Sequence, residues 1–282
     1  MIIDFHTHTF PDAIAGRVVK QLGGVSHTLP FSDGTMDGLV SSMKKGGVDY
    51  SVTLPVMTTT GQVEKINRLV MEQQELTADR GIVAFGGMHP DYADYKQELI
   101  RLREHKVPGI KLHPAYQNVD LNDIRMMRII DAASEQGLVI VTHAGIDIGI
   151  YDHNYASVSH ILQVVDEVRP KKLVLAHMGG WGCWEDIRRD LAGAPVWFDT
   201  AFSIGAVTAD PAQEDAPYLT ENLSDEAFVR LCRAHGTDRI LFGSDSPWED
   251  QADYVERVQR TSLSQEEKQQ IFSENARRLL EI

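Results

Sequence analysis

The stretch "DFHTH" near the start of the sequence places two histidines one residue apart. Alternate residues of an extended strand point to the same side, so His6 and His8 are predicted to face one way and Thr7 the other. With Cα atoms about 7 Å apart, the two imidazoles can converge on one cation at about 2.0–2.1 Å from each ring nitrogen. The spacing predicts a chelating pair for a divalent metal, and hydrogen-bonded structural histidines are the alternative interpretation.

Three further ionisable residues stand at the ends of apolar runs elsewhere in the sequence. His143 ends "VIVTH", His177 ends "LVLAH" and Asp245 ends "ILFGSD". The carboxyl ends of parallel barrel strands carry active sites, because the loops that follow them gather there. Distant segments that all deliver metal-type ligands to one rim are hard to explain by packing, so we predict a metal site at this rim.

The run "GIKLHP" adds a lysine and a histidine to the same rim. Lys111 and His113 share one face, which we expect to point into the barrel, while Ile110 and Leu112 face the helices. A buried ammonium group needs a partner. Asp245, an anionic substrate or a carboxylated lysine that bridges two metals would each meet that need, and a side chain that extends to solvent is the alternative.

Aromatic side chains follow two of these motifs. Trp181 comes shortly after His177, and Trp248 comes shortly after Asp245. We predict that Lys111, His113, Trp181 and Trp248 contact the substrate. Packing of the two tryptophans at the starts of the following helices is the equally weighted alternative.

These residues require a scaffold that brings their strands together. Eight short runs rich in Val, Ile and Leu lie at 2–6, 50–56, 81–88, 107–113, 137–145, 171–180, 194–201 and 238–245. Runs that are apolar on both faces are typical of parallel strands covered by helices. Helical patterns are found at 35–47, 62–80, 120–137, 157–168, 183–193, 223–236, 251–260 and 264–282.

Eight strands alternating with helices predict an α/β fold, a (β/α)8 TIM barrel formed by residues 1–282 as a single domain. An open doubly wound sheet is the alternative. The long irregular stretch at 203–222 follows the seventh strand, and loops of this length are usually functional, so we expect it to cap the site.

The composition of the chain limits the classes of binding partner to be expected. The formal net charge is −14 and no Lys/Arg cluster is present, which argues against nucleic acid or an anionic membrane as a partner. No run of 18 apolar residues is found, "MIIDF" does not read as a signal peptide, and the two cysteines lack the spacing of a metal clip. We therefore expect a cytoplasmic protein that acts on a small-molecule substrate.

Taken together, the motifs resemble the amidohydrolase superfamily, and more narrowly the amidohydrolase-related branch that includes aminocarboxymuconate-semialdehyde decarboxylase. The resemblance covers nearly the whole chain and is carried by "DFHTH", "THAG", "AHMGG" and "LFGSDSPW" in this order, with "ENARRLL" similar to the family's closing helix. Decarboxylases of this branch are usually longer than this chain, which lacks room for their insertions.

The resemblance implies one divalent metal held by His6, His8, His143 and Asp245, with Asp245 and His177 as catalytic residues. Zinc is the first expectation because imidazole and carboxylate ligands suit it, and manganese, iron and nickel are alternatives. A second metal bridged by a carboxylated Lys111 would add His177 as a ligand and is the less favoured option. Dimers are common in the superfamily, so a homodimer is a further option.

The implied activity is hydrolysis, in which metal-activated water attacks the carbonyl of a small amide, ester or lactone. Asp245 would accept the proton of the water and return it to the leaving group, while His177 stabilises the oxyanion. Two alternatives stay open: non-oxidative decarboxylation of a small aromatic or dienoic acid, and a metal-binding barrel without turnover.

Overall fold

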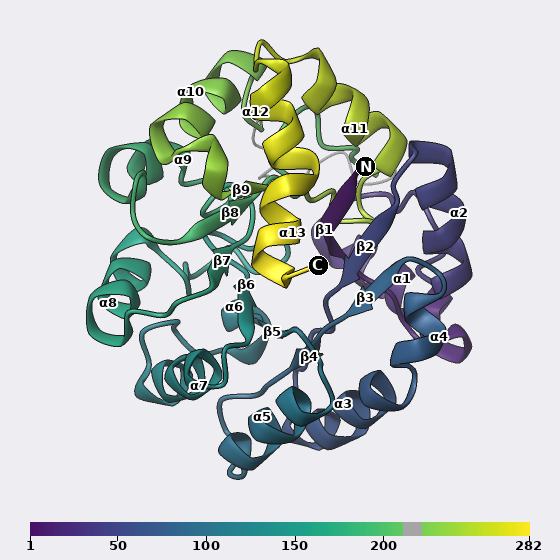
Figure 1. The fold of residues 1–282 in the computed structure, drawn as a ribbon, viewed down its shortest axis with the longest axis vertical. Helices are drawn as coiled ribbons and strands as arrows, with labels where there is room; N and C mark the ends of the chain where they lie inside the picture. Colours follow the sequence, from purple (N-terminus) through teal and green to yellow (C-terminus); the bar gives the residue numbers. More distant parts are fainter. Residues whose placement is uncertain (211–221) are drawn as a thin grey trace.

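Parallel strands form a ring at the centre of the molecule, as seen in the computed structural model, which describes residues 1–210 and 222–282 (Figure 1). The strands are β1 (Ile3–Thr7), β2 (Tyr50–Thr53), β3 (Ile82–Ala84), β4 (Gly86–Gly87), β5 (Gly109–Leu112), β6 (Val139–Thr142), β7 (Leu173–Leu175), β8 (Trp197–Asp199) and β9 (Ile240–Leu241). Their order is β1-β2-β3 in one sheet and β4-β5-β6-β7-β8-β9 in the other, and every pairing is parallel.

The two sheets make one closed barrel of eight strands. β3 and β4 are consecutive parts of one strand that is interrupted only at Phe85. The other seam closes between β1 and the β9 segment, where the Phe5 amide donates to the Phe242 carbonyl at 2.7 Å and Thr7 forms a parallel bridge with Ser246. The predicted (β/α)8 barrel is confirmed, and each of the eight predicted strand runs overlaps an observed strand.

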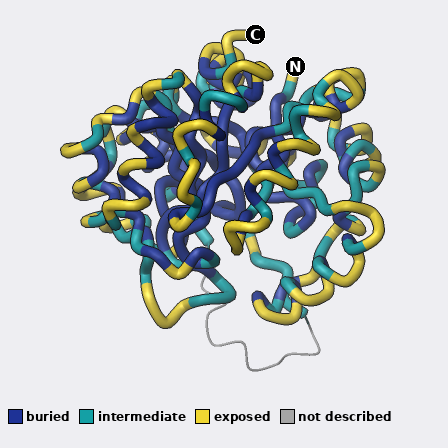
Figure 2. Tube along the Cα trace, turned by 90° about the horizontal axis from the view of Figure 1, so that it is seen from below, coloured by how far each residue is buried: buried dark blue, intermediate teal, exposed yellow. Residues whose placement is uncertain are grey.

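Helices surround the ring and cover its outer face (Figures 1 and 2). They are α1 (Asp12–Ser26), α2 (Met36–Gly46), α3 (Val63–Glu72), α4 (Gln74–Ala78), α5 (Tyr95–Glu104), α6 (Pro114–Gln117), α7 (Ile124–Glu135), α8 (Val158–Val168), α9 (Trp184–Asp186), α10 (Asp225–His235), α11 (Gln251–Arg260), α12 (Gln265–Gln269) and α13 (Asn275–Leu280). π-helical turns at Ile187–Leu191 and Gln270–Glu274 continue α9 and join α12 to α13. In the described part of the chain, no helix combines the length and the apolar character needed to cross a membrane.

An apolar cluster fills the barrel interior below the polar rim. It includes Phe5 of β1, Val52 of β2 and Val141 of β6, with Leu279 of α13 beneath them. The larger cluster lies between the strands and the helices. Filling of the barrel by side chains leaves room for polar groups only near its ends.

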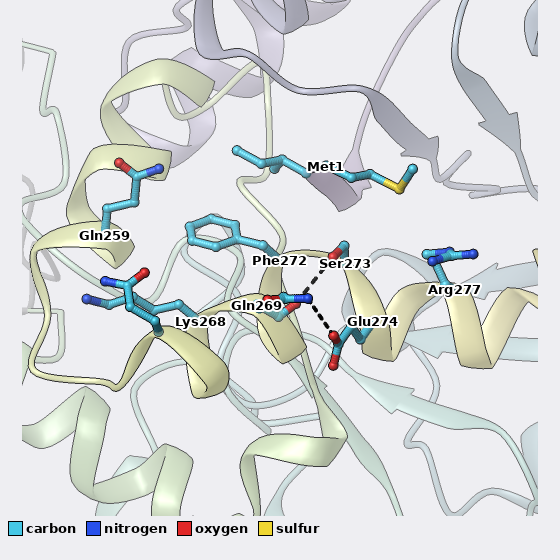
Figure 3. A pocket seen from close by; sticks show the side chains of 10 residues that line it. Met1, Gln259, Lys268, Gln269, Phe272, Ser273, Glu274 and Arg277 are labelled. Atoms are coloured by element: carbon cyan, nitrogen blue, oxygen red, sulfur yellow. Dashed lines mark hydrogen bonds between the residues drawn. The ribbon is translucent and has the colours of Figure 1, made fainter.

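The two ends of the barrel differ. Both termini lie at the end where the strands begin (Figure 2). A hollow of about 810 Å³ at this end is lined by Met1, Phe272, Arg277 and neighbouring residues (Figure 3). None of the predicted site residues lines it, and they belong instead to the opposite end. Of the predicted capping stretch 203–222, residues 211–221 lie outside the described part of the chain.

Candidate metal centre

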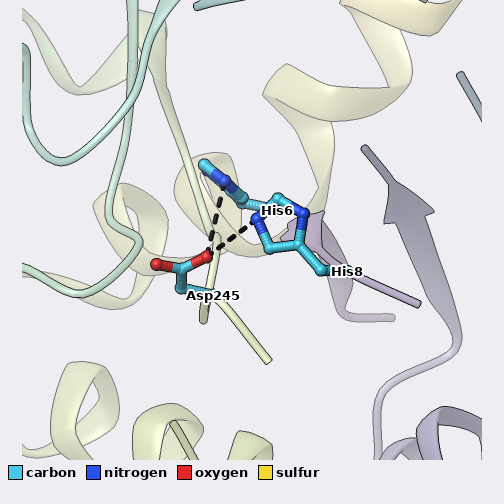
Figure 4. A group of neighbouring side chains, drawn as sticks. All are labelled: His6, His8 and Asp245. Atoms are coloured by element: carbon cyan, nitrogen blue, oxygen red, sulfur yellow. Dashed lines mark ion pairs between the residues drawn. The ribbon is translucent and has the colours of Figure 1, made fainter. Parts of the chain in front are cut away.

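His6, His8 and Asp245 meet at the carboxyl end of the barrel, with donor atoms within 4.8 Å of one another (Figure 4). Asp245 Oδ1 lies 3.1 Å from His8 Nε2 and 3.5 Å from His6 Nε2. Two ligand atoms about 2.0–2.1 Å from a tetrahedral ion stand about 3.3 Å apart. The spacing of the three atoms therefore fits a single small divalent ion.

A bulge in β1 aims the first ligand. Relative to β2, β1 carries one extra residue between Asp4 and Thr7. Phe5 packs in the barrel interior, and His6 next to it also points inward, which regular alternation would forbid. Bulges of this kind re-aim side chains at active sites.

Asp245 is held against β1 by backbone contacts. Its amide donates to the His6 carbonyl at 2.8 Å, and the His8 amide donates to the Ser246 carbonyl at 2.7 Å. Asp245 adopts a left-handed backbone with φ of 74°, and His177 does so with φ of 61°. Such conformations are uncommon for residues with a Cβ and persist where surrounding contacts enforce them, often at functional sites.

Hydrogen-bond acceptors on the far side of each imidazole determine which ring nitrogen faces the site. Nδ1 of His6 lies 2.8 Å from Asp199 Oδ2, and Nδ1 of His8 lies 2.7 Å from the Leu54 carbonyl. Carboxylate and carbonyl oxygens only accept, so Nδ1 carries the proton in both rings and Nε2 is left as a lone pair. Two lone pairs and the Asp245 carboxylate then converge, an arrangement that suits the binding of a divalent cation.

His177 is oriented in the same way and contacts His143. The Nδ1 atom of His177 donates to the Ala201 carbonyl at 3.0 Å, and its Nε2 lies 3.0 Å from Nδ1 of His143. The rings of His6 and His177 are 5.3 Å apart between centroids. His177 therefore borders the candidate metal position, and its catalytic role stays a prediction.

His143 lies between His177 and a second polar group. The donor atoms of His113, His143 and Asp147 are also within 4.8 Å of one another. Asp147 Oδ2 is 3.6 Å from His113 Nε2 and 3.8 Å from His143 Nε2. Because Nδ1 of His143 faces His177, the ligation of the first metal by His143 stays a prediction.

Lys111 points inward, as predicted, and is 1% exposed. Its Nζ lies 3.3 Å from His6 Nε2. Among the described residues, no carboxylate oxygen lies within 4.0 Å of this Nζ. Burial lowers the pKa of Lys111 to about 8, against the opposing effect of Asp199 and Asp245.

Burial also sets the charge of the histidines. It lowers the pKa of His6 well below its usual range, and the Lys111 ammonium lowers it further. Burial likewise lowers the pKa of His143 and His177. At neutral pH these rings are neutral, the form in which imidazole binds a metal. Burial raises the pKa of Asp147 to about 6.

The two tryptophans lie in different surroundings. Trp181 is buried, donates from Nε1 to Asn222 Oδ1 at 3.0 Å, and packs edge-on against Trp184 with centroids 6.4 Å apart. Trp248 is half-buried, and its ring lies over Gly23 of α1. These contacts suit packing roles, and contact of either ring with substrate stays a prediction.

Sequence reasoning missed two buried carboxylates of the site, Asp199 and Asp147. Asp199 ends the seventh apolar run, "PVWFD", so the rule that singled out Asp245 also pointed to it. Asp147 lies in the loop after β6, where Gly145 pairs with Ala156 and Trp181. Only this tertiary pairing brings Asp147 back over the barrel, and no pattern in the sequence signals it.

Three solved structures illustrate the likeness of the fold. An uncharacterised TIM-barrel protein from Bordetella bronchiseptica is 16% identical with a TM-score of 0.76, covering 99% of this chain and 98% of that one. A dihydroxybenzoic acid decarboxylase from a Polaromonas species, with bound manganese and the inhibitor 2-nitroresorcinol, is 16% identical with a TM-score of 0.71, covering 99% and 96%. A putative 2-pyrone-4,6-dicarboxylic acid hydrolase from Pseudomonas putida is 16% identical with a TM-score of 0.63, covering 99% and 97%.

At 16% identity the three likenesses show a shared fold and leave the activity open. No curated protein matches the sequence. The family model described as "Amidohydrolase" matches residues 3–282. A match of this extent, on a barrel whose rim gathers His6, His8 and Asp245, shows that the chain belongs to the amidohydrolase family.

Proposed function

We propose that this protein is a metal-dependent hydrolase that adds water to the carbonyl of a small amide, ester or lactone. The observation that carries the proposal is the convergence of three acceptor atoms, His6 Nε2, His8 Nε2 and Asp245 Oδ1. Asp245 Oδ1 lies 3.5 Å from His6 Nε2 and 3.1 Å from His8 Nε2. We propose that these atoms and His143 hold one divalent ion, zinc or manganese.

When bound, the ion would supply Lewis-acid polarisation of a carbonyl and a water of lowered pKa. The chain's own groups would handle protons. The Asp245 carboxylate accepts a proton at one oxygen and later returns it to the leaving group. The backbone contact to His6 holds the main chain of Asp245 in place, and the contacts of Oδ1 to His6 and His8 place the carboxylate itself.

Lys111 and His177 would stabilise negative charge on the substrate. Lys111 Nζ lies in the same space as the metal ligands, at 3.3 Å from His6 Nε2. His177 presents Nε2 to the same side, so a proton delivered there would donate toward the substrate. Charged donors in a buried site stabilise an oxyanion far more than they would in water.

Decarboxylation of a small aromatic or dienoic acid is the second candidate. The buried Lys111 ammonium without a carboxylate within ion-pair distance, among the described residues, favours a substrate that brings its own carboxylate. The Polaromonas decarboxylase and related barrels give this candidate support at the level of fold. A metal-binding barrel without turnover is the third.

A paired assay separates the three candidates. Purified protein loaded with zinc or manganese is incubated with a lactone, ester and amide series that includes 2-pyrone-4,6-dicarboxylate, and with a dihydroxybenzoate series. Proton release from a lactone or ester, or amine release from an amide, without carbon dioxide supports hydrolysis, and carbon dioxide release supports decarboxylation. Absence of turnover with every member, in protein that holds its metal, would favour the barrel without turnover.

A further inference from the structure

His143 differs from the other site histidines in the contacts of the ring nitrogen that points away from the candidate metal position. His6, His8 and His177 each place Nδ1 against an oxygen acceptor at 2.7 to 3.0 Å. The corresponding outer atom of His143 is Nε2, which is buried and has no hydrogen-bond partner in the described part of the chain. A buried polar atom without a partner calls for an explanation.

The state of this nitrogen follows from its neighbours. The Ala201 carbonyl only accepts, so His177 carries its proton on Nδ1 and, when neutral, has a lone pair on Nε2. That lone pair is 3.0 Å from His143 Nδ1, which must therefore be the donor. The proton of a neutral His143 is then on Nδ1, and Nε2 is a bare lone pair that lies 3.8 Å from the Asp147 carboxylate.

A second metal between His113, His143 and Asp147 is the first explanation to consider. The rings of His113 and His143 are stacked, with centroids 4.5 Å apart and planes at 16°. Ring lone pairs lie in the ring plane, so near-parallel rings do not aim them at a common point. The Tyr116 amide also donates to His113 Nδ1 at 3.3 Å, which leaves the proton of His113 on Nε2. Both features argue against ligation by this pair.

We propose instead that Asp147 is a positioning residue that holds His143 on the metal. The proposal rests on the proposed function, in which His143 is a ligand. When Nδ1 of His143 binds the metal, its ring proton moves to Nε2, and Nε2 then donates to Asp147 Oδ2 as the two groups close by less than 1 Å from 3.8 Å. His143 and Asp147 then match His6 and Asp199, whose contact is 2.8 Å.

The position of Asp147 suits this role. Its side chain is buried, and the Gly149 amide donates to Oδ1 at 2.8 Å, so Oδ2 is the oxygen that faces the histidines. Carboxylates that receive the outer N–H of a ligating histidine fix its tautomer and raise its basicity, and their loss typically lowers metal affinity 10–100-fold.

The test compares Asp147→Ala and Asp147→Asn with the wild-type protein. Zinc affinity is measured by competition with a chelator, the cobalt-loaded proteins are compared by visible absorption, and the His143 ring N–H is followed by NMR in zinc-loaded protein. We expect Asp147→Ala to weaken zinc binding about 10–100-fold, to change the cobalt spectrum and to remove the protected N–H signal. Asp147→Asn should recover part of the affinity, because its amide oxygen still accepts.

Asp120→Asn is the matched control. Asp120 also contacts a histidine, His153, at 2.7 Å, but this pair is exposed and lies outside the site. The Asp120→Asn variant should leave zinc affinity unchanged. Zinc affinity of Asp147→Ala within twofold of wild type would overturn the inference. It would also be overturned if the wild type bound two zinc equivalents and Asp147→Ala bound one, because Asp147 would then be a ligand of a second metal. A wild-type protein that binds no divalent ion would instead overturn the proposed function, on which this inference rests.

Discussion

Nδ1 of His6 lies 2.8 Å from Oδ2 of Asp199, a carboxylate that is fully buried and 193 residues further along the chain. The other oxygen of Asp199 accepts from the His177 amide at 2.9 Å and from the Ala201 amide at 3.1 Å. The Asp199 side chain thus keeps the proton of His6, a predicted metal ligand, on Nδ1. It also anchors the backbone of His177.

Asp199→Asn is predicted to weaken metal binding with little effect on the fold. The amide oxygen can keep the two backbone contacts, which places the amide NH2 against His6 Nδ1. His6 must then accept at Nδ1 and carry its proton on Nε2, the atom that faces the metal. We expect a 10–100-fold lower affinity for zinc, measured by competition with a chelator.

The reference variant for this experiment is Asp186→Asn, on the exposed helix α9. Both variants should show the circular dichroism spectrum of the wild type. Equal zinc affinity of Asp199→Asn and the wild type would show that the His6 tautomer does not govern ligation.

Asp245→Asn is predicted to lower turnover by at least about 100-fold, the scale of general acid–base catalysis. It removes the negative charge that faces His6 and His8, and an amide cannot take up the proton that the carboxylate would accept. The backbone contact of residue 245 to His6 does not involve the side chain, so the fold should persist. Turnover is compared in protein whose metal content has been measured, because near-normal turnover with full metal would refute the role.

Lys111→Met is predicted to raise the KM of an anionic substrate about tenfold or more, since a charged hydrogen bond contributes about 1.5–3 kcal/mol. Methionine is apolar and similar in length, so it replaces a buried cation without leaving an unpaired charge. Its thermal stability should equal or exceed that of the wild type. The KM of neutral substrates serves as the comparison. If the KM of anionic substrates were also unchanged in Lys111→Met, Lys111 would have no role in substrate binding.

The strands and the rim could be predicted from the sequence because each depends on local pattern. Apolar runs identified all eight barrel strands, their ends identified His6 and Asp245, and strand alternation added His8. The bulge that turns His6 inward beside Phe5 was not predictable, because it arises from the pairing of β1 with β2. Helix α1 also escaped notice, since its glycines Gly16, Gly23 and Gly24 weaken the helical pattern.

The relation of His143 to the other ligands could not be read from strand positions alone. The rule that strand ends meet at one rim is correct to within a few ångströms, which brings His143 beside His177. Which nitrogen each ring presents depends on outer acceptors such as the Ala201 carbonyl and Asp147. Those acceptors come from other strands and loops, so they become visible only in three dimensions.

His235 gives a prediction about stability that is independent of the metal. It is 1% exposed and stacks on Phe198 with centroids 3.7 Å apart. The Gly193 amide donates to its Nδ1 at 3.2 Å, and its Nε2 lies 3.0 Å from the Val196 carbonyl. Nδ1 is therefore an acceptor, and protonation there would set two donors against each other.

Burial accordingly lowers the pKa of His235 from 6.5 to about 4. The unfolded chain binds this proton more readily than the folded one, so stability rises with pH through the interval between the two values. The contribution is fully present above pH 6.5 and is lost as pH falls toward 4, at about 1.4 kcal/mol per pH unit. Between pH 7 and pH 5 the wild type should lose about 2 kcal/mol through this group.

Urea unfolding of the metal-free wild type and His235→Gln at pH 7 and pH 5 tests this prediction. Glutamine does not titrate, so the variant should lose about 2 kcal/mol less than the wild type over the same interval. The other buried histidines titrate alike in both proteins and cancel in the difference. If the two proteins lost the same free energy of unfolding, the proton on His235 would not be linked to folding, and its buried neutral state would be wrong.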